Sequence, residues 1–142
     1  MSGQGHTILL VEDNEDDVFF MRRALSKAQI KIPLQVAADG QKALDYLSGA
    51  GHYADRAQYP LPSLIFLDLK LPFISGFEVL NWVRSQATLR EIPVVILTSS
   101  SEERDRQKAT ELGVKTYLVK PPTPETLREA IQVLQQAQIA AA

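Results

Sequence analysis

The stretch from Thr7 to Asn14 reads TILLVEDN, and it decides the fold. Its apolar part, which ends at Val11, is too short and too uniformly apolar for a surface helix, so it predicts a buried β-strand. Glu12 and Asp13 follow directly. Asn14 is a typical helix N-cap residue, so the stretch predicts a buried strand that ends in two acids and leads into a helix.

The predicted helix after Asn14 has an acidic start and an apolar face. Residues 15–17 are all acidic and fill its first turn, where carboxylates complement the helix dipole. Val18, Met21 and Leu25 then recur at helical spacing. The pattern predicts a helix with one side packed on a core.

The same order of a short strand and a longer helix repeats along the chain. Further strands are predicted at residues 33–38, 64–67, 92–97 and 115–119. The next helices are expected to start after Asp39, Ser75, Ser100 and Thr123, with capping by Ser75 and Glu78 and by Ser100 and Glu103. Five alternating pairs predict a doubly wound α/β domain, with a parallel sheet covered by helices on both faces. Leu127, Ile131 and Leu134 provide the buried stripe of the last helix, and the Ala-rich end predicts a fraying terminus.

Length and composition point to one domain. The 142 residues suit a single domain, residues 1–142 with a core at about 7–135, and no output domain is expected. The polar, proline-containing segment 49–63 predicts an exposed loop.

Composition also excludes several classes of protein. The formal net charge is −2 and no block of Lys and Arg occurs, which argues against nucleic-acid binding. The chain has no cysteine, which excludes disulfides, zinc–thiolate sites and thiol catalysis. No apolar run approaches the roughly 20 residues that span a bilayer, and the N-terminal residues resemble no signal peptide. We expect a cytoplasmic protein with neither membrane nor nucleic acid as partner.

Polar residues fall where the predicted strands end. Glu12 and Asp13 follow the first strand, Asp68 the third, Thr98 the fourth and Lys120 the fifth. Because open parallel sheets bind ligands at the carboxyl ends of their strands, we expect these side chains to share one pocket. Three carboxylates at close range repel one another and need a cation, and Mg²⁺ suits oxygen ligands.

Such a pocket suits phosphoryl transfer. An aspartate beside Mg²⁺ can attack phosphorus and form an acyl phosphate. The metal, the Lys120 ammonium and the Thr98 hydroxyl can then neutralise the charged phosphoryl oxygens. Each of these residues, taken alone, also has a purely structural explanation. Asp68 is typical of a turn, Thr98 of a β-strand and Lys120 of a solvent-exposed surface. Their joint placement favours the phosphoryl site.

Several motifs in one order carry a family resemblance. They are LLVEDN at residues 9–14, LDLKLP at 67–72 with Gly76 after it, ILTSS at 96–100 and VKPP at 119–122. Together they resemble the receiver domain of response regulators in two-component signalling, over nearly the whole chain. The resemblance implies a flavodoxin-like sheet of order 2-1-3-4-5 and a phosphoryl group received from a sensor histidine kinase.

The resemblance assigns roles to the acidic residues. Asp68 would be the phosphorylated residue and a metal ligand. Asp13 would bind Mg²⁺ directly, Glu12 mainly through water, and Lys70 through its backbone carbonyl.

The resemblance also assigns the phosphoryl contacts and the switch. Lys120 and Thr98 would contact the phosphoryl group, and Thr98 and Tyr117 would form the switch that responds to it. The Lys120–Pro121 bond matches a family position at which the peptide is often cis.

The implied protein is a signalling switch and not an enzyme, since it assists only its own phosphorylation and dephosphorylation. Its output would come through protein–protein contact or onward phosphotransfer, by way of the fourth helix, fifth strand and fifth helix. The long segment 49–63 and the lack of an output domain resemble stand-alone response regulators paired with phytochromes, which suggests a phytochrome as the kinase. The downstream protein and the oligomeric state stay open, a homodimer being one option.

Two features near Asp68 raise further questions. Lys70, two residues after Asp68, departs from the family pattern. Its side chain can cover the phosphoryl group and hinder attack by water, which predicts a long-lived phosphorylated form. Phe73 and Ile74 are large, apolar and close to the site, and local packing or contact with a partner would each explain them.

Three other functions compete with this interpretation. An aspartyl-phosphate hydrolase of the haloacid-dehalogenase type would need a second aspartate where Lys70 stands. An FMN-binding protein would need a Gly/Ser/Thr-rich loop after the first strand, where the acidic residues 12–17 would repel phosphate. A degenerate receiver used as a binding module is not favoured, because every phosphorylation residue is present.

Overall fold

The computed structural model describes the backbone of residues 5–141 and the side chains of residues 5–132. Within that range the strands form one parallel sheet of order β2-β1-β3-β4-β5. The strands are β1 (Ile8–Val11), β2 (Leu34–Ala37), β3 (Leu64–Leu67), β4 (Val94–Thr98) and β5 (Thr116–Val119). The predicted α/β class and strand order are confirmed.

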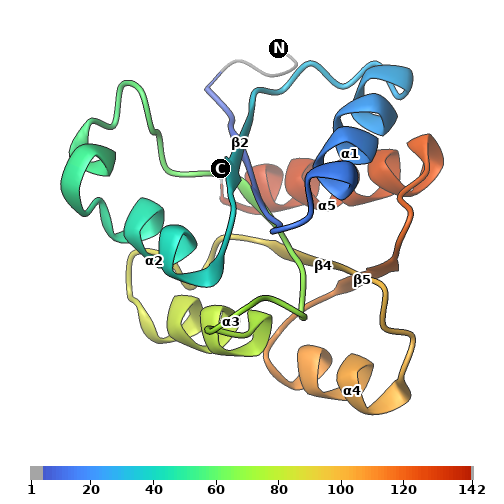
Figure 1. Ribbon diagram of the computed structural model, residues 1–142. Coiled ribbons are helices and arrows are strands. Elements are labelled where there is room, and N and C mark those ends of the chain that lie inside the picture. The colour runs from blue at the N-terminus through green and yellow to red at the C-terminus, as the bar shows by residue number, and fades with distance from the viewer. Residues whose placement is uncertain (1–4, 142) are drawn as a thin grey trace.

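Helices cover both faces of the sheet (Figure 1). They are α1 (Glu15–Lys27), α2 (Gly40–Ser48), α3 (Gly76–Ser85), α4 (Glu103–Glu111) and α5 (Pro124–Ala141), with a short 3₁₀ turn, η1 (Gly51–Ala54). Helices α1 and α5 pack on one face, and α2, α3 and α4 pack on the other. No helix among the described residues has the length and apolar character needed to cross a membrane.

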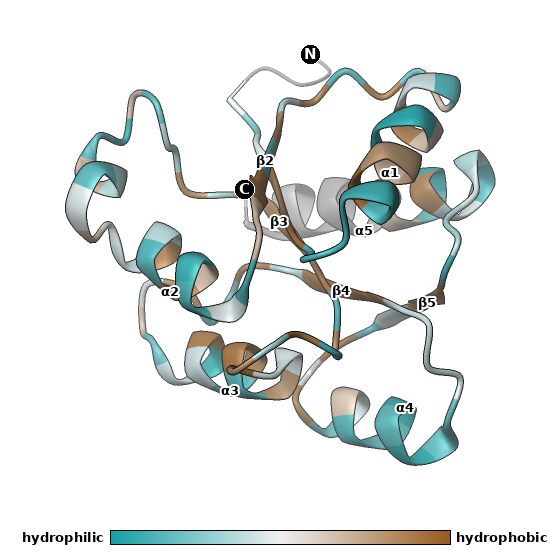
Figure 2. Cartoon of the chain, viewed as in Figure 1, coloured by the Kyte–Doolittle hydropathy of each residue, from teal (hydrophilic) through white to brown (hydrophobic). Residues whose placement is uncertain are grey.

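The core consists of two layers, one on each face of the sheet. Because side chains alternate along a strand, Leu9 and Val11 face the α2–α3–α4 layer while Ile8 and Leu10 face the α1–α5 layer. The same alternation holds in β3 and β4, so all three central strands are apolar on both sides. Figure 2 shows β3 and β4 in brown, the colour of hydrophobic residues. The continuous apolar runs in the sequence follow from this burial.

Most predicted helix starts are confirmed in detail. The side chains of Asn14 and Asp39 accept hydrogen bonds from the backbone at the starts of α1 and α2. Ser75 and Glu78 form the complete capping box of α3. Thr123 Oγ1 likewise accepts from a backbone N–H at the start of α5.

The predicted capping of α4 by Ser100 and Glu103 is wrong. The N-cap residue is Glu102, which makes no side-chain cap hydrogen bond. Ser100 instead donates its hydroxyl to Asp105 at 2.7 Å and accepts from the Glu102 N–H at 3.3 Å. The hydroxyl therefore links the β4–α4 loop to the side chain of Asp105 in the first turn of α4, but it does not cap the helix.

The expectation of an exposed loop at 49–63 is only partly right. Tyr53 and Tyr59 pack against the core layer beneath α2 and α3. Arg56 donates to the carbonyl oxygens of Tyr46 and Leu47 at 2.8 and 3.0 Å, so it satisfies the C-terminal end of α2. Sequence alone does not reveal this because the anchoring arginine lies within an otherwise polar stretch.

At the last helix the described side chains agree with the expected packing. Leu127 and Ile131 are buried against the α1–α5 layer. The expected contribution of Leu134 lies outside the described side chains, and the backbone of α5 is helical through Ala141.

Strand register brings the strand ends to one rim. Val11 lies level with Leu67 across the β1–β3 pair, and the Asp68 N–H donates to the Val11 carbonyl at 3.2 Å. At the ends of the paired strands β4 and β5, the Lys120 N–H donates to the Thr98 carbonyl at 2.8 Å. The polar residues that follow β1, β3 and β5 therefore start from the same edge.

Candidate functional site

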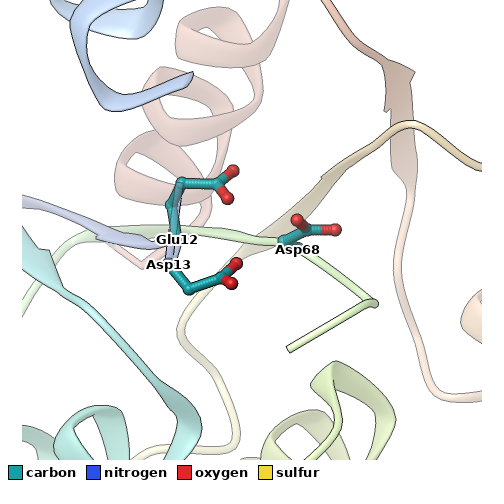
Figure 3. A group of neighbouring side chains, drawn as sticks. All are labelled: Glu12, Asp13 and Asp68. Atoms are coloured by element: carbon teal, nitrogen blue, oxygen red, sulfur yellow. The ribbon is translucent and has the colours of Figure 1, made fainter. Parts of the chain in front are cut away.

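Three carboxylates meet at this rim. Glu12 and Asp13 directly follow β1 and Asp68 directly follows β3, and each offers an oxygen within 4.8 Å of the others. Figure 3 shows the carboxyl groups of Glu12 and Asp13 directed toward the side on which Asp68 lies. The predicted convergence of the three carboxylates is thus present in the geometry.

The three acids differ in solvent exposure. Glu12 and Asp68 are 2% and 5% exposed, whereas Asp13 is open to solvent. Burial raises the pKa of Glu12 above its ordinary value, although the nearby Lys120 ammonium and the Asn14 N–H act in the opposite direction. The site is therefore a buried pair of acids with one solvent-facing acid at its mouth.

A single ammonium serves this group. Lys120 Nζ lies 2.6 Å from Glu12 Oε1, 2.8 Å from Asp17 Oδ2 and 2.9 Å from Asp68 Oδ2. A lysine ammonium has three donors, so each donor has one carboxylate. Burial opposes the charge, but hydrogen bonds to Asp17, Glu12 and Asp68 outweigh it and raise the pKa of Lys120. The lysine is held as a cation at the centre of the site.

Asp17 is the site residue that sequence reasoning misses. The sequence pattern places it among three acids that complement the dipole of α1, yet its carboxylate reaches Lys120. One signal is present: Asp17 lies four residues before Met21, which is buried, and residues at that spacing share a helix face. Glu15 and Asp16, at other angles of the same turn, are exposed.

The β3–α3 loop positions Asp68 closely. The Lys70 N–H donates to Asp68 Oδ1 at 3.1 Å, while the Lys70 residue itself is exposed. Gly76 opens α3 with its N–H donating to the Leu69 carbonyl at 3.0 Å. A Cβ on Gly76 would overlap the Asp68 carbonyl oxygen, so only glycine permits this approach.

The two apolar residues of that loop behave differently. Ile74 is partly buried against the core. Phe73 is fully exposed and has a φ of 67°, a conformation that residues other than glycine seldom adopt. Local packing thus explains Ile74 but not Phe73.

Thr98 and Tyr117 belong to the neighbouring strands β4 and β5. Thr98 ends β4 fully buried, and its Oγ1 accepts from the Ser100 N–H at 3.4 Å. The Tyr117 hydroxyl donates to the Ser100 carbonyl at 2.9 Å, and the Arg106 guanidinium lies 4.5 Å from the centre of the Tyr117 ring. Ser100 therefore links the two expected switch residues. The expected cis bond at Lys120–Pro121 is present.

The donor set suits a hard divalent cation. Glu12, Asp13 and Asp68 offer carboxylate oxygens alone, without nitrogen or sulfur ligands. Such a set favours Mg²⁺ or Mn²⁺ over zinc or copper, and the exposed position of Asp13 leaves room for coordinated water. The residues present therefore fit the implied metal.

Comparisons of the sequence and of the structure with known proteins agree on one family. The family model described as the response regulator receiver domain matches residues 8–132. The response regulator Rcp1 of Synechocystis sp. is 38% identical over 125 residues, which cover 88% of this chain and 83% of Rcp1. The Mn²⁺-bound structure of Rcp1 has a TM-score of 0.74 at 36% identity, covering 92% of this chain and 90% of that one.

Two further solved structures are similar. The bacteriophytochrome response regulator AtBRR has a TM-score of 0.81 at 46% identity, with 92% of each chain covered. The phosphorylated cyanobacterial phytochrome response regulator RcpA has a TM-score of 0.76 at 34% identity, with 96% of each chain covered. The rim of carboxylates around one lysine, the strand order and these matches agree: the chain belongs to the response regulator receiver domain family, and phytochrome response regulators are among its close relatives.

Proposed function

We propose that this protein is a phospho-accepting switch in which Asp68 takes a phosphoryl group with Mg²⁺ as cofactor. The observation that carries the proposal is the meeting of three carboxylates and one partly buried ammonium at the ends of β1, β3 and β5. Asp13, Asp68, the Lys70 backbone carbonyl and, through water, Glu12 would hold the metal. When bound, Mg²⁺ supplies positive charge that offsets the acids and the phosphoryl oxygens.

The chemistry is a displacement at phosphorus. A carboxylate oxygen of Asp68 forms the new O–P bond while the bond from phosphorus to the donor nitrogen or oxygen breaks. Lys120, already 2.9 Å from Asp68 Oδ2, donates to a phosphoryl oxygen once the group is attached. The Thr98 hydroxyl, now bonded to the Ser100 N–H, turns to a second oxygen. Both contacts stabilise charge on the transferred group.

The phosphoryl donor is a sensor histidine kinase, and similarity to bacteriophytochrome and cyanobacterial phytochrome response regulators suggests that the kinase is a phytochrome. Phosphorylation converts the singly charged carboxylate of Asp68 into an acyl phosphate that carries nearly two negative charges. Reorientation of Thr98 and Tyr117, which share Ser100, would carry that change to α4, β5 and α5 for contact with a downstream protein or for onward transfer. The protein would act in the cytoplasm as a signalling component and not as an enzyme.

Incubation with acetyl phosphate and Mg²⁺, followed by intact mass measurement, tests the proposal. We expect one added phosphoryl group that is labile to base and absent when a chelator removes the metal. Asp68→Asn keeps an oxygen acceptor for the Lys70 N–H but cannot form the acyl phosphate, so it should gain no mass. Phosphorylation of Asp68→Asn would move the acceptor elsewhere, and an unmodified wild-type protein would favour a binding module.

The side chain of Lys70 should prolong the phosphorylated state. It is exposed two residues after the acceptor, where it can cover the phosphoryl group and exclude water. We expect Lys70→Asn to shorten the half-life of the acyl phosphate several-fold, measured as loss of phosphoryl mass after removal of acetyl phosphate. Lys115→Asn, at another exposed lysine, is the matched control. A half-life of only seconds that is equal in both variants and the wild type would contradict this role.

A further inference from the structure

Asp17 contacts the site through Lys120, although it does not belong to the acidic group that suits a metal. Its Oδ2 accepts from Lys120 Nζ at 2.8 Å, as close as the contact with Asp68 at 2.9 Å. The carboxylates that share a metal-sized space are Glu12, Asp13 and Asp68. Of the three carboxylates that contact Lys120, Asp17 is therefore the one outside the acidic group that suits a metal.

The backbone fixes Asp17 well. Its own N–H donates to the side chain of Asn14 at 3.1 Å, which is the N-cap hydrogen bond of α1. Its side chain is about two-thirds buried, with 31% exposure. A lysine side chain has four rotatable bonds and loses entropy when its ammonium is fixed, so a rigid acceptor outside the group of metal-binding acids is useful.

The two other carboxylates on Lys120 change their surroundings during the reaction. Asp68 becomes the acyl phosphate, and Glu12 belongs to the group of acids that suits the metal. Asp17, on α1, takes no part in either change. It can keep one of the three ammonium donors occupied while the others turn toward the phosphoryl oxygens.

We propose that Asp17 is a positioning residue that anchors the Lys120 ammonium during phosphoryl transfer to Asp68. This inference rests on the proposed function of Asp68 as acceptor. This positioning role differs from the stabilisation of the helix dipole that any acid in the first turn of α1 provides. Glu15 and Asp16 fill that role as well, and among the described residues neither forms an ion pair.

The first test compares Asp17→Ala with Asp16→Ala, which removes the same charge from the same turn but leaves Lys120 untouched. With acetyl phosphate and Mg²⁺, Asp17→Ala should lower the maximal phosphorylation rate about 10- to 100-fold, the size usual for a lost supporting contact. The apparent KM for acetyl phosphate should stay the same, since Asp17 does not bind the donor. Asp16→Ala should match the wild type in both quantities.

Asp17→Asn tests whether the anchor needs only a well-placed acceptor oxygen or also its negative charge. It keeps an oxygen that can accept from Lys120 and the backbone bond to Asn14, so it should lose less rate than the alanine variant. Urea unfolding of each variant shows whether the fold is intact. Equal rates for Asp17→Ala and Asp16→Ala would overturn the anchor role.

A double-mutant cycle with Lys120→Ala gives the sharper result. If Asp17 acts through Lys120, then Asp17→Ala should cause no further loss of rate in the Lys120→Ala protein. Additive losses would overturn the inference and leave the proposed function standing. A wild-type protein that takes up no phosphoryl group would overturn both, so the two failures are distinguishable.

Discussion

Replacing Lys120 with alanine should destabilise the metal-free protein by about 3–5 kcal/mol, the cost usual for removing one partner of a buried ion pair. Glu12 and Asp68 are almost excluded from solvent, and in the described structure their charges are balanced by this ammonium. Without Lys120 they would repel each other and Asp13. Urea unfolding in the presence of a chelator measures the loss.

Magnesium should restore much of that stability. A ligand that binds the folded state alone stabilises it in proportion to the logarithm of its concentration over Kd. In Lys120→Ala no ammonium competes for the oxygens of Glu12 and Asp68, so Mg²⁺ should raise the urea midpoint of this variant more than that of the wild type. The phosphorylation rate should nevertheless stay about 100-fold or more below the wild type, because one of the two proposed side-chain contacts with the phosphoryl group is gone.

Lys115→Ala is the matched control for charge. Lys115 is exposed and lies just before β5, so its loss should change neither stability nor rate. If Lys120→Ala were as stable as Lys115→Ala without metal, Lys120 would not be the counter-ion of the buried acids.

Replacing Gly76 with alanine should destabilise the protein by about 2–3 kcal/mol and slow phosphorylation, as overpacking of a tight site does. The new Cβ would overlap the Asp68 carbonyl oxygen and lie 2.7 Å from Leu69 Cα. Both are backbone atoms, so the start of α3 or the end of β3 must shift. Asp68 itself would move, and the transfer rate should fall together with stability.

Gly51→Ala separates the clash from the loss of glycine's freedom. Gly51 has a φ of 57°, but a Cβ added there would have no heavy atom within 4 Å. We expect this substitution to cost about 1 kcal/mol through backbone conformation alone and to leave the phosphorylation rate unchanged. Equal effects at the two glycines, measured by urea unfolding and by acetyl phosphate labelling, would argue against a steric role for Gly76.

The fold follows from the sequence because local and global signals agree. Short apolar runs, helix caps such as Asn14 and Ser75, and strict alternation of elements all favour one parallel arrangement. Parallel strands end at the same rim, and this rule alone predicts that Glu12, Asp13, Asp68 and Lys120 come together.

Long side chains and irregular loops account for what the sequence does not predict. The contact between Asp17 and Lys120 spans 103 residues of chain and depends on how α1 crosses the end of β1, which helical periodicity does not fix. The prediction for Ser100 is wrong because a capping sequence also suits a loop in which the serine bonds to Asp105. Arg56 could not be linked to the end of α2 because its guanidinium reaches carbonyls nine and ten residues earlier.

The position of Lys120 after β5 has a consequence for when the site exists. Among the described residues, strand β5 is an edge of the sheet and pairs with β4 alone. The carboxylates that contact Lys120 lie in α1 and directly after β1 and β3. During synthesis the residues that carry the acids, 12–68, therefore leave the ribosome before residue 120, which carries their counter-ion. In the proposed function, competence to accept a phosphoryl group would thereby depend on the docking of β5 beside β4.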